Sequence, residues 1–402
     1  MLSLKHPQII NFVNQLTLGL YPLRIREDSK VKLIVKAPKE ILLTAKLNKE
    51  FKIYVVSILI GDEPTIYLIS AFFDNANEPL YISTPLFKEF SQDYLEILLG
   101  QSVDIHFFDE HNYELLGYEA SLKLPDKTRA LIAKSRFIPF SQTSNVYILN
   151  HELSWFGGRN SEDDLNAITV SLTTPLFPDD FVIVDAREFE YDVTGKPKIH
   201  HTALEREEPG SYQEREIEKL LKRIFPASNI YLNPLKINDR EEIADILVVG
   251  YDHILIVQAK DSPNIEKIIS NTVTRKRATA KKHLDKALQQ VMGAVKYVTS
   301  VSGKVNFFVR DREISVNTIN PNIRTLVVMK ELFLDDYKSY TDEILRVCNK
   351  VNTPCIPLEY IELHQHTMNI SNEKEFFDAY DKIFLIGMTD GAFPRLRIFP
   401  TL

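Results

Sequence analysis

Cysteine and long apolar runs are scarce in this 402-residue chain, and each scarcity excludes a class of protein. Two cysteines cannot build a disulfide framework, and so low a content is typical of a reducing compartment. No apolar run approaches the roughly 20 residues of a membrane helix, and the first residues lack the basic start and apolar block of a signal peptide. The sequence also lacks a Walker lysine loop, a dinucleotide glycine fingerprint and a nucleophile elbow. We therefore expect a cytoplasmic protein without a membrane partner.

An excess of positive charge is also absent from the chain as a whole, which carries a net charge of −7. One segment departs from that average, because residues 260–304 hold ten basic and three acidic residues, a local charge of +7. A basic run is either a solvated helix face or a surface that neutralises nucleic-acid phosphates. The residues just upstream decide between these two interpretations.

Hydrophobic patterning predicts a mixed α/β chain in which residues 1–195 form a strand-rich α/β region for recognition or regulation. Predicted strands lie at 52–60, 65–73, 103–108, 146–150, 167–174 and 181–185, and a predicted helix at 86–99 ends at Gly100. The sequence Thr-Pro-Leu-Phe occurs at 84–87 and again at 174–177, which indicates either two related units or a shared turn. Residues 196–210, rich in charge, proline and glycine, form the predicted linker.

Residues 211–402 alternate between helical and strand patterns, which predicts a sheet covered by helices on both faces. The predicted elements are a helix at 212–225, a strand at 230–235, a hairpin at 243–260, a helix at 278–300, strands at 305–309 and 323–329, a helix at 336–349, a strand at 356–363 and a helix from Ser371.

Three polar side chains interrupt the otherwise apolar hairpin at 243–260. If Val249 pairs with Ile254 across the turn, Asp245 lies opposite Gln258, and Lys260 shares their face because side chains alternate along a strand. Buried carboxylates and ammonium groups need partners. The hairpin therefore ends either in a simple ion pair or in a metal site with a lysine beside it.

The helix before the hairpin contributes a glutamate. Its apolar stripe over 217–224 places Glu214 on the inward face, whereas Glu216 and Glu218 are expected on more solvated sides. Glu214 either complements the positive end of the helix or completes the site at the hairpin. Whether Glu214 or Glu218 completes that site stays open.

These residues together resemble the PD-(D/E)XK nuclease superfamily, and more narrowly its Mrr-like restriction endonuclease branch. Over about residues 210–310, Asp245 matches the motif aspartate, Gln258-Ala259-Lys260 the Gln-x-Lys element, and Glu214 the helix glutamate. Ala244 stands where the family name has proline, and Gln258 replaces the second acid. The second departure removes one negative charge from the site.

The resemblance implies a restriction-endonuclease-like core, a mixed sheet flanked by helices, in a Mg²⁺-dependent endonuclease that hydrolyses DNA in restriction or anti-phage defence. Asp245, the carbonyl of Ala259 and Glu214 would bind Mg²⁺, for which Mn²⁺ would substitute, because hard cations prefer oxygen ligands. Lys260 would orient the attacking water and stabilise charge on the phosphate, and Gln258 would hydrogen-bond that water.

Beside such a site, the basic residues favour nucleic acid as the partner, with DNA favoured over RNA. The residues predicted to contact it are Arg275, Lys276, Arg277, Lys281, Lys282 and Lys286. Residues 1–195 would then bind a protein partner or a trigger. Two alternatives stay open: an RNA-directed nuclease, and a catalytically inactive nuclease-like scaffold or nucleic-acid-binding protein, which Gln258 permits. The oligomeric state is open as well, a homo-oligomer included.

Overall fold

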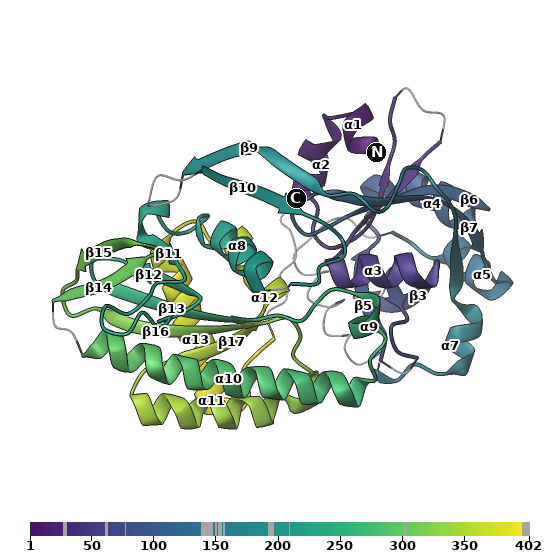
Figure 1. Ribbon diagram of the computed structural model, residues 1–402. Coiled ribbons are helices and arrows are strands. Elements are labelled where there is room, and N and C mark those ends of the chain that lie inside the picture. Colours follow the sequence, from purple (N-terminus) through teal and green to yellow (C-terminus); the bar gives the residue numbers. More distant parts are fainter. Residues whose placement is uncertain are drawn as a thin grey trace.

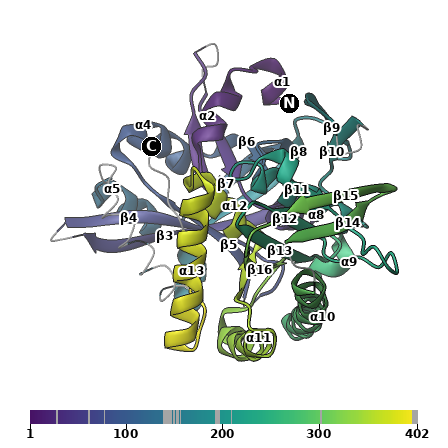
Figure 2. The ribbon, with the colours of Figure 1, turned by 90° about the vertical axis from the view of Figure 1, so that its left-hand side faces the viewer.

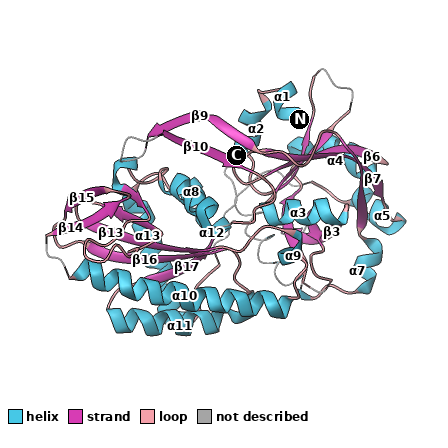
Figure 3. Cartoon of the chain, in the orientation of Figure 1, coloured by secondary structure: helices cyan, strands magenta, loops and turns pink. Residues whose placement is uncertain are grey.

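The computed structural model describes residues 1–26, 30–60, 63–76, 78–137, 148, 151, 155, 157–191, 197–208, 210–300 and 303–395. It confirms the mixed α/β fold class, since each half of the chain contains a large sheet with helices packed around it (Figures 1 and 3). The strand predicted at 146–150 lies outside the described residues, apart from Ile148. Among the described residues, no helix is long and apolar enough to cross a membrane.

An eight-stranded sheet forms the first half, in the order β1-β2-β6-β7-β8-β3-β4-β5. Neighbouring strands are antiparallel except for β2 and β6. The two edge strands meet, because the Leu20 N–H donates a hydrogen bond of 2.9 Å to the Thr84 hydroxyl. The elements are α1 (Leu2–Lys5), α2 (Ile9–Gln15), β1 (Gly19–Leu23), β2 (Lys32–Lys36), α3 (Lys39–Asn48), β3 (Glu50–Ile60), β4 (Glu63–Phe72), β5 (Leu80–Pro85), η1 (Lys88–Phe90), α4 (Ser91–Leu99), β6 (Ser102–Phe108), β7 (Glu114–Lys123), α5 (Asp126–Lys134), α7 (Ser161–Asn166) and β8 (Ile168–Pro175).

Each of the two Thr-Pro-Leu-Phe sequences lies at the end of a strand, and both strands belong to this sheet. Thr84-Pro85 ends β5 at an edge, whereas Thr174-Pro175 ends β8 between β7 and β3. Proline lacks the N–H that a strand ladder uses, so it suits a strand end. The repeat therefore marks a shared strand end within a single sheet.

The two halves are joined by a ribbon of β9 (Ile183–Tyr191) and β10 (Pro197–Thr202), drawn across the top of Figure 1. The segment predicted as a linker thus contains a strand. Its later residues are tied to the second half, because the backbones of Arg206 and Asn264 exchange hydrogen bonds of 3.0 and 2.9 Å. Arg206 itself is buried. The described part of this segment is consequently structured and anchored.

A five-stranded sheet, in the order β11-β12-β13-β16-β17, forms the second half. β13, β16 and β17 run parallel, while β11, β12 and β13 form an antiparallel meander. Figure 1 shows α10 and α11 below this sheet and α8 above it, and Figure 2 shows α10 and α11 side by side, almost end-on. The elements are α8 (Gly210–Leu221), η2 (Ala227–Asn229), β11 (Ile230–Leu232), β12 (Ile246–Val249), β13 (His253–Lys260), α9 (Glu266–Ile269), α10 (Val273–Thr299), β14 (Lys304–Val309), β15 (Arg312–Asn317), β16 (Asn322–Met329), η3 (Leu334–Asp336), α11 (Tyr337–Val351), β17 (Cys355–Glu359), α12 (Tyr360–Asn369) and α13 (Glu373–Asp390).

The predicted boundaries of two elements in this half are wrong. The strand predicted at 356–363 stops at Glu359, and α12 begins at Tyr360, because Glu359 and Glu362 form a reciprocal capping box. The long helix begins at Val273 rather than near 278, with Thr272 as its cap. The basic run from Arg275 to Arg277 therefore lies inside the first turns of α10 and not before the helix.

Candidate active site

The predicted hairpin register is confirmed, and it brings the three polar residues together. Val249 pairs with Ile254, and the ladder ends at Ile246 and Val257. Just beyond that end, Asp245 Oδ2 accepts a hydrogen bond of 2.6 Å from the Ala259 N–H and lies 3.3 Å from Lys260 Nζ. Lys260 Nζ also donates to the Ala259 carbonyl oxygen at 2.8 Å. The lysine thus contacts two of the three groups predicted to bind a metal, Asp245 and the Ala259 carbonyl.

Glu214 reaches this cluster from the first turns of α8. Asn233 Nδ2 donates to Glu214 Oε2 at 3.1 Å, and the Asn233 N–H donates to the Asp245 carbonyl at 3.0 Å. Asn233 therefore links the helix glutamate to the strand aspartate. Burial, and then the neighbouring carboxylate of Asp245, raise the pKa of Glu214, while Asn233 and Lys260 oppose the rise.

Glu242, an exposed residue, is an electrostatic neighbour of the site that the sequence did not predict. Burial and the carboxylates of Asp245 and Glu214 raise the pKa of Glu242 to about 7. Asp245 and Glu214 are thus negative neighbours of Glu242, and Lys260 supplies only part of the positive charge that would offset them. A divalent cation would supply that charge.

Gln258, the residue that replaces the second acid, is the most enclosed member of the site. It is 1% exposed, and within the described part of the chain its Oε1 atom has no hydrogen-bond partner. A buried oxygen acceptor without a donor is costly. This orphaned oxygen, together with carboxylate and carbonyl oxygens, makes a donor set that fits Mg²⁺ or Mn²⁺ and suits zinc poorly.

Glu216 and Glu218 are not solvated, which corrects the sequence expectation. Glu216 Oε1 lies 2.7 Å from Lys39 Nζ, and its Oε2 accepts from Arg206 at 3.2 Å. Glu218 is buried and lies 3.5 Å from Lys222. α8 is covered here, because it packs against β11, β13 and α12, and Glu216 pairs with Lys39 of the first half. Glu218 pairs with Lys222, whereas Glu214 is linked to Asp245 through Asn233. Glu214 is therefore the better candidate to complete the site.

The basic residues of α10 divide into two groups. Lys276 forms an ion pair with Asp74 of the first half, Arg277 lies 3.3 Å from Glu78 and 2.8 Å from Asp335, and Lys281 lies 3.3 Å from Glu343. Lys281 is nevertheless exposed, as are Arg275, Lys282 and Lys286. Half of the predicted phosphate-contacting residues therefore face carboxylates of this chain.

His283 connects the exposed lysines of α10 with the hairpin. Burial lowers its pKa, and the positive charges of Lys260, Lys282 and Lys286 lower it further. The imidazole is consequently neutral near pH 7. It is a hydrogen-bonding group beside Lys260 rather than another cation for phosphate.

A buried charge cluster between the two halves was also missed by sequence reasoning. Lys39 Nζ lies 2.7 Å from Glu216, 3.1 Å from Asp109 and 3.8 Å from Glu110. Glu110, His111 and Glu216 place ligand atoms within 4.8 Å of one another, a spacing that a metal ion could use. The Lys39 ammonium already supplies the positive charge there, and His111 is hydrogen-bonded to Tyr360. Lys39 and Glu216 are too far apart in sequence for any local pattern to signal their contact.

The chain matches no protein-family model and no curated protein. Any statement of its function therefore depends on the geometry and chemistry of the site itself.

Proposed function

We propose that the chain is a metal-dependent nuclease that hydrolyses phosphodiester bonds, most plainly a DNA endonuclease acting in restriction or anti-phage defence. One observation carries the proposal: at the open end of one hairpin, Asp245 Oδ2 lies 3.3 Å from Lys260 Nζ, and Asn233 links Asp245 to Glu214. The arrangement agrees with the motif that the sequence shares with PD-(D/E)XK nucleases. Enzymes that cleave phosphodiesters with Mg²⁺ need oxygen ligands and a nearby cation, which this cluster provides.

Asp245, the Ala259 carbonyl and Glu214 would hold Mg²⁺, with Mn²⁺ as a substitute. The bound ion would polarise the scissile phosphate and acidify a water molecule. Glu242 adds a carboxylate whose pKa is raised to about 7 without metal, and a bound cation would favour its ionised form. The Gln258 amide hydrogen-bonds but does not act as a base.

Lys260 would act on the phosphate through its ammonium group. In this structure its Nζ atom donates hydrogen bonds to both Asp245 Oδ2 and the Ala259 carbonyl oxygen. Once those oxygens serve the metal, the ammonium is free to donate to a phosphate oxygen and to stabilise the charge that develops there. The Lys260 side chain is mostly buried, and an electrostatic interaction with phosphate is stronger there than it would be in bulk water.

Nucleic acid would approach along the exposed residues of α10. Arg275, Lys282 and Lys286 lie on that helix, and both lysines act electrostatically on His283, as does Lys260. Positive side chains next to a cleavage site position the sugar-phosphate backbone without reading its sequence. Such a basic path favours nucleic acid as the substrate over a small-molecule phosphodiester.

Reversing three of the exposed charges of α10 tests that path. The triple variant Arg275→Glu, Lys282→Glu and Lys286→Glu should weaken duplex DNA binding and reduce the slope of log K against log salt by about one for each lost phosphate contact. Fluorescence anisotropy at several salt concentrations measures both. Lys374→Glu, an exposed lysine on α13, is the matched control. Unchanged binding and slope in the triple variant would show that α10 does not contact the backbone.

The function itself is tested by incubating the purified chain with supercoiled DNA, linear DNA and RNA, in Mg²⁺, in Mn²⁺ and in EDTA. We expect metal-dependent cleavage of the DNA substrates and none in EDTA. Cleavage confined to RNA would correct the substrate. Calorimetric Mg²⁺ or Mn²⁺ binding with no cleavage of any substrate would instead identify an inactive nuclease-like scaffold.

A further inference from the structure

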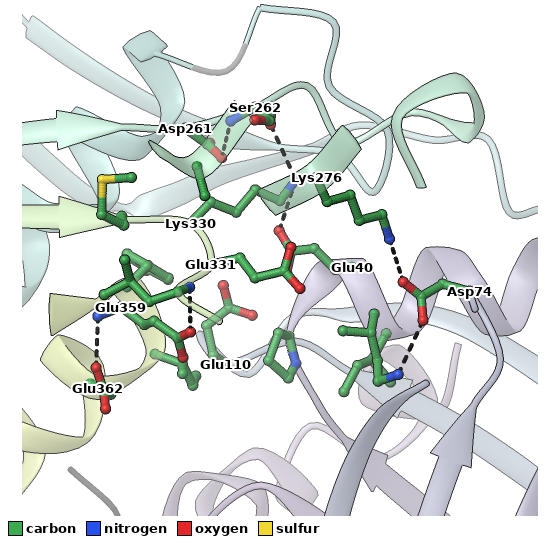
Figure 4. A pocket seen from close by; sticks show the side chains of 18 of the residues that line it. Glu40, Asp74, Glu110, Asp261, Ser262, Lys276, Lys330, Glu331, Glu359 and Glu362 are labelled. Carbon is green, nitrogen blue, oxygen red and sulfur yellow. Dashed lines mark hydrogen bonds and ion pairs between the residues drawn. The ribbon is translucent and has the colours of Figure 1, made fainter. Parts of the chain in front are cut away.

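A cavity of about 420 Å³ lies between the two halves of the chain. This volume is typical of sites for small organic molecules at domain interfaces. Its apolar wall comes from both halves, with Ile41, Leu80 and Ile82 from the first and Met329 and Leu332 from the second. Figure 4 shows that charged side chains project into the same space.

The lining has more acidic than basic residues. Among the described residues that line the cavity, eight are Asp or Glu and five are Lys or Arg. Each of those five Lys or Arg side chains already contacts a carboxylate. The pairs are Lys276 with Asp74, Lys330 with Glu40, Arg206 with Glu216, Arg395 with Glu362 and Lys260 with Asp245. An anionic ligand would therefore find no uncommitted cation in the lining, whereas a cationic ligand would find acidic partners such as Glu110 and Glu331.

Buried oxygen acceptors around the cavity lack donors. Glu110 is 4% exposed, and its Oε2 atom has no hydrogen-bond partner within the described residues, while Lys39 Nζ lies 3.8 Å from Oε1. Gln213, which also lines the cavity, is 3% exposed, and its Oε1 atom likewise has no partner in the described part of the chain. Figure 4 shows Glu331 projecting into the same space from the other half, beside Glu40. The missing component is thus a donor of hydrogen bonds.

We propose that this cavity binds a linear polyamine, an organic cation whose amino groups are joined by methylene segments. The amino groups would donate to Glu110, Gln213 and Glu331, and the methylene segments would cover the apolar wall. A lone metal ion fits less well, because it would leave that wall in contact with water. The ligand would touch both halves of the chain and lie beside Lys260, which lines the same cavity.

The titration of Glu110 agrees with such a ligand. Burial, with the nearby Asp109 and Glu216 carboxylates, raises the pKa of Glu110 to about 8, although Lys39 opposes the rise. Without ligand the carboxyl group is therefore mostly uncharged at pH 7. A bound ammonium group would favour its ionised form. Glu110→Gln should consequently preserve the unliganded fold while removing the charge that a polyamine would use.

Isothermal titration calorimetry of the full chain with spermidine, free of nucleic acid, tests the proposal. We expect a single saturable site and an affinity loss of about tenfold or more in Glu110→Gln. Gln365→Lys, which places an ammonium group in the cavity, should weaken binding similarly. Glu162→Gln, at an exposed ion pair on α7, is the matched control and should bind like the unaltered chain.

Three results would overturn the proposal: no saturable spermidine binding, an affinity unchanged in both cavity variants, or Glu110-dependent binding of MgCl₂ without spermidine binding. The titration requires no cleavage activity. Its outcome is therefore separate from that of the proposed nuclease function.

Discussion

Replacing Lys260 with methionine is expected to lower the rate of metal-dependent cleavage by about 10²- to 10³-fold. Methionine keeps the length and apolar character of the side chain but removes the ammonium group that would stabilise charge on the phosphate. Single-turnover cleavage with saturating Mg²⁺ isolates the chemical step. Lys260 Nζ is the cation nearest the Asp245 carboxylate in the described structure, at 3.3 Å, so no neighbour is placed to replace it.

Lys267→Met is the matched control, because Lys267 is exposed on α9 and only seven residues further along the chain. It should cleave at the original rate. Thermal unfolding of both variants separates a catalytic loss from a folding defect, since Asp245 keeps its hydrogen bond from the Ala259 N–H. A correctly folded Lys260→Met chain that cleaves normally would remove this lysine from the mechanism.

Replacing Lys39 with methionine is expected to reduce the free energy of unfolding by about 3–5 kcal/mol, the usual consequence of breaking a buried ion pair. Lys39 is 1% exposed and lies among the carboxylates of Asp109, Glu110 and Glu216. Burial alone would lower the pKa of Lys39, but these carboxylates outweigh burial and raise it. Without the ammonium, they would repel one another in an environment poor in water. Urea unfolding measures the loss.

Lys46→Met is the control on the same helix. Lys46 pairs at 3.0 Å with Glu205, whose side chain is half exposed, and such pairs contribute about 0–1 kcal/mol. Adding Glu216→Gln to Lys39→Met should recover part of the lost stability, because it removes one of the repelling charges. If Lys39→Met unfolds like Lys46→Met, the cluster between the halves does not hold them together.

The hairpin could be predicted because its chemistry is local. A turn at Gly250 fixes the pairing of Val249 with Ile254, and the alternation of side chains then places Asp245, Gln258 and Lys260 on one face. Glu214 followed from helical spacing. Glu242 could not be found this way, because the chain before it does not keep the strand period. There, Leu235 bridges to Glu242, and the Ile243 N–H donates to the Pro234 carbonyl.

Contacts across the two halves were beyond sequence reasoning for a different reason. Lys276 was predicted to contact phosphate, yet it pairs with Asp74 of the first half. Arg206 was predicted to lie in a linker, yet it is buried. Lys36 is a similar case within β2, since its ammonium donates to the carbonyls of Val13 and Leu16 at 3.0 and 2.7 Å. Each polar group is satisfied by a distant partner that no local pattern reveals.

The nuclease proposal is tested most directly by comparing the unaltered chain with Asp245→Asn in a plasmid-cleavage assay. Asparagine preserves the size of the side chain and can still accept a hydrogen bond from the Ala259 N–H, but it removes the charge that would hold the metal. We expect the unaltered chain to nick or linearise supercoiled DNA in Mg²⁺ or Mn²⁺ but not in EDTA, and Asp245→Asn to be at least about 10²-fold slower. Equal cleavage by the two chains, or no cleavage by the unaltered chain in either metal, would contradict the proposal.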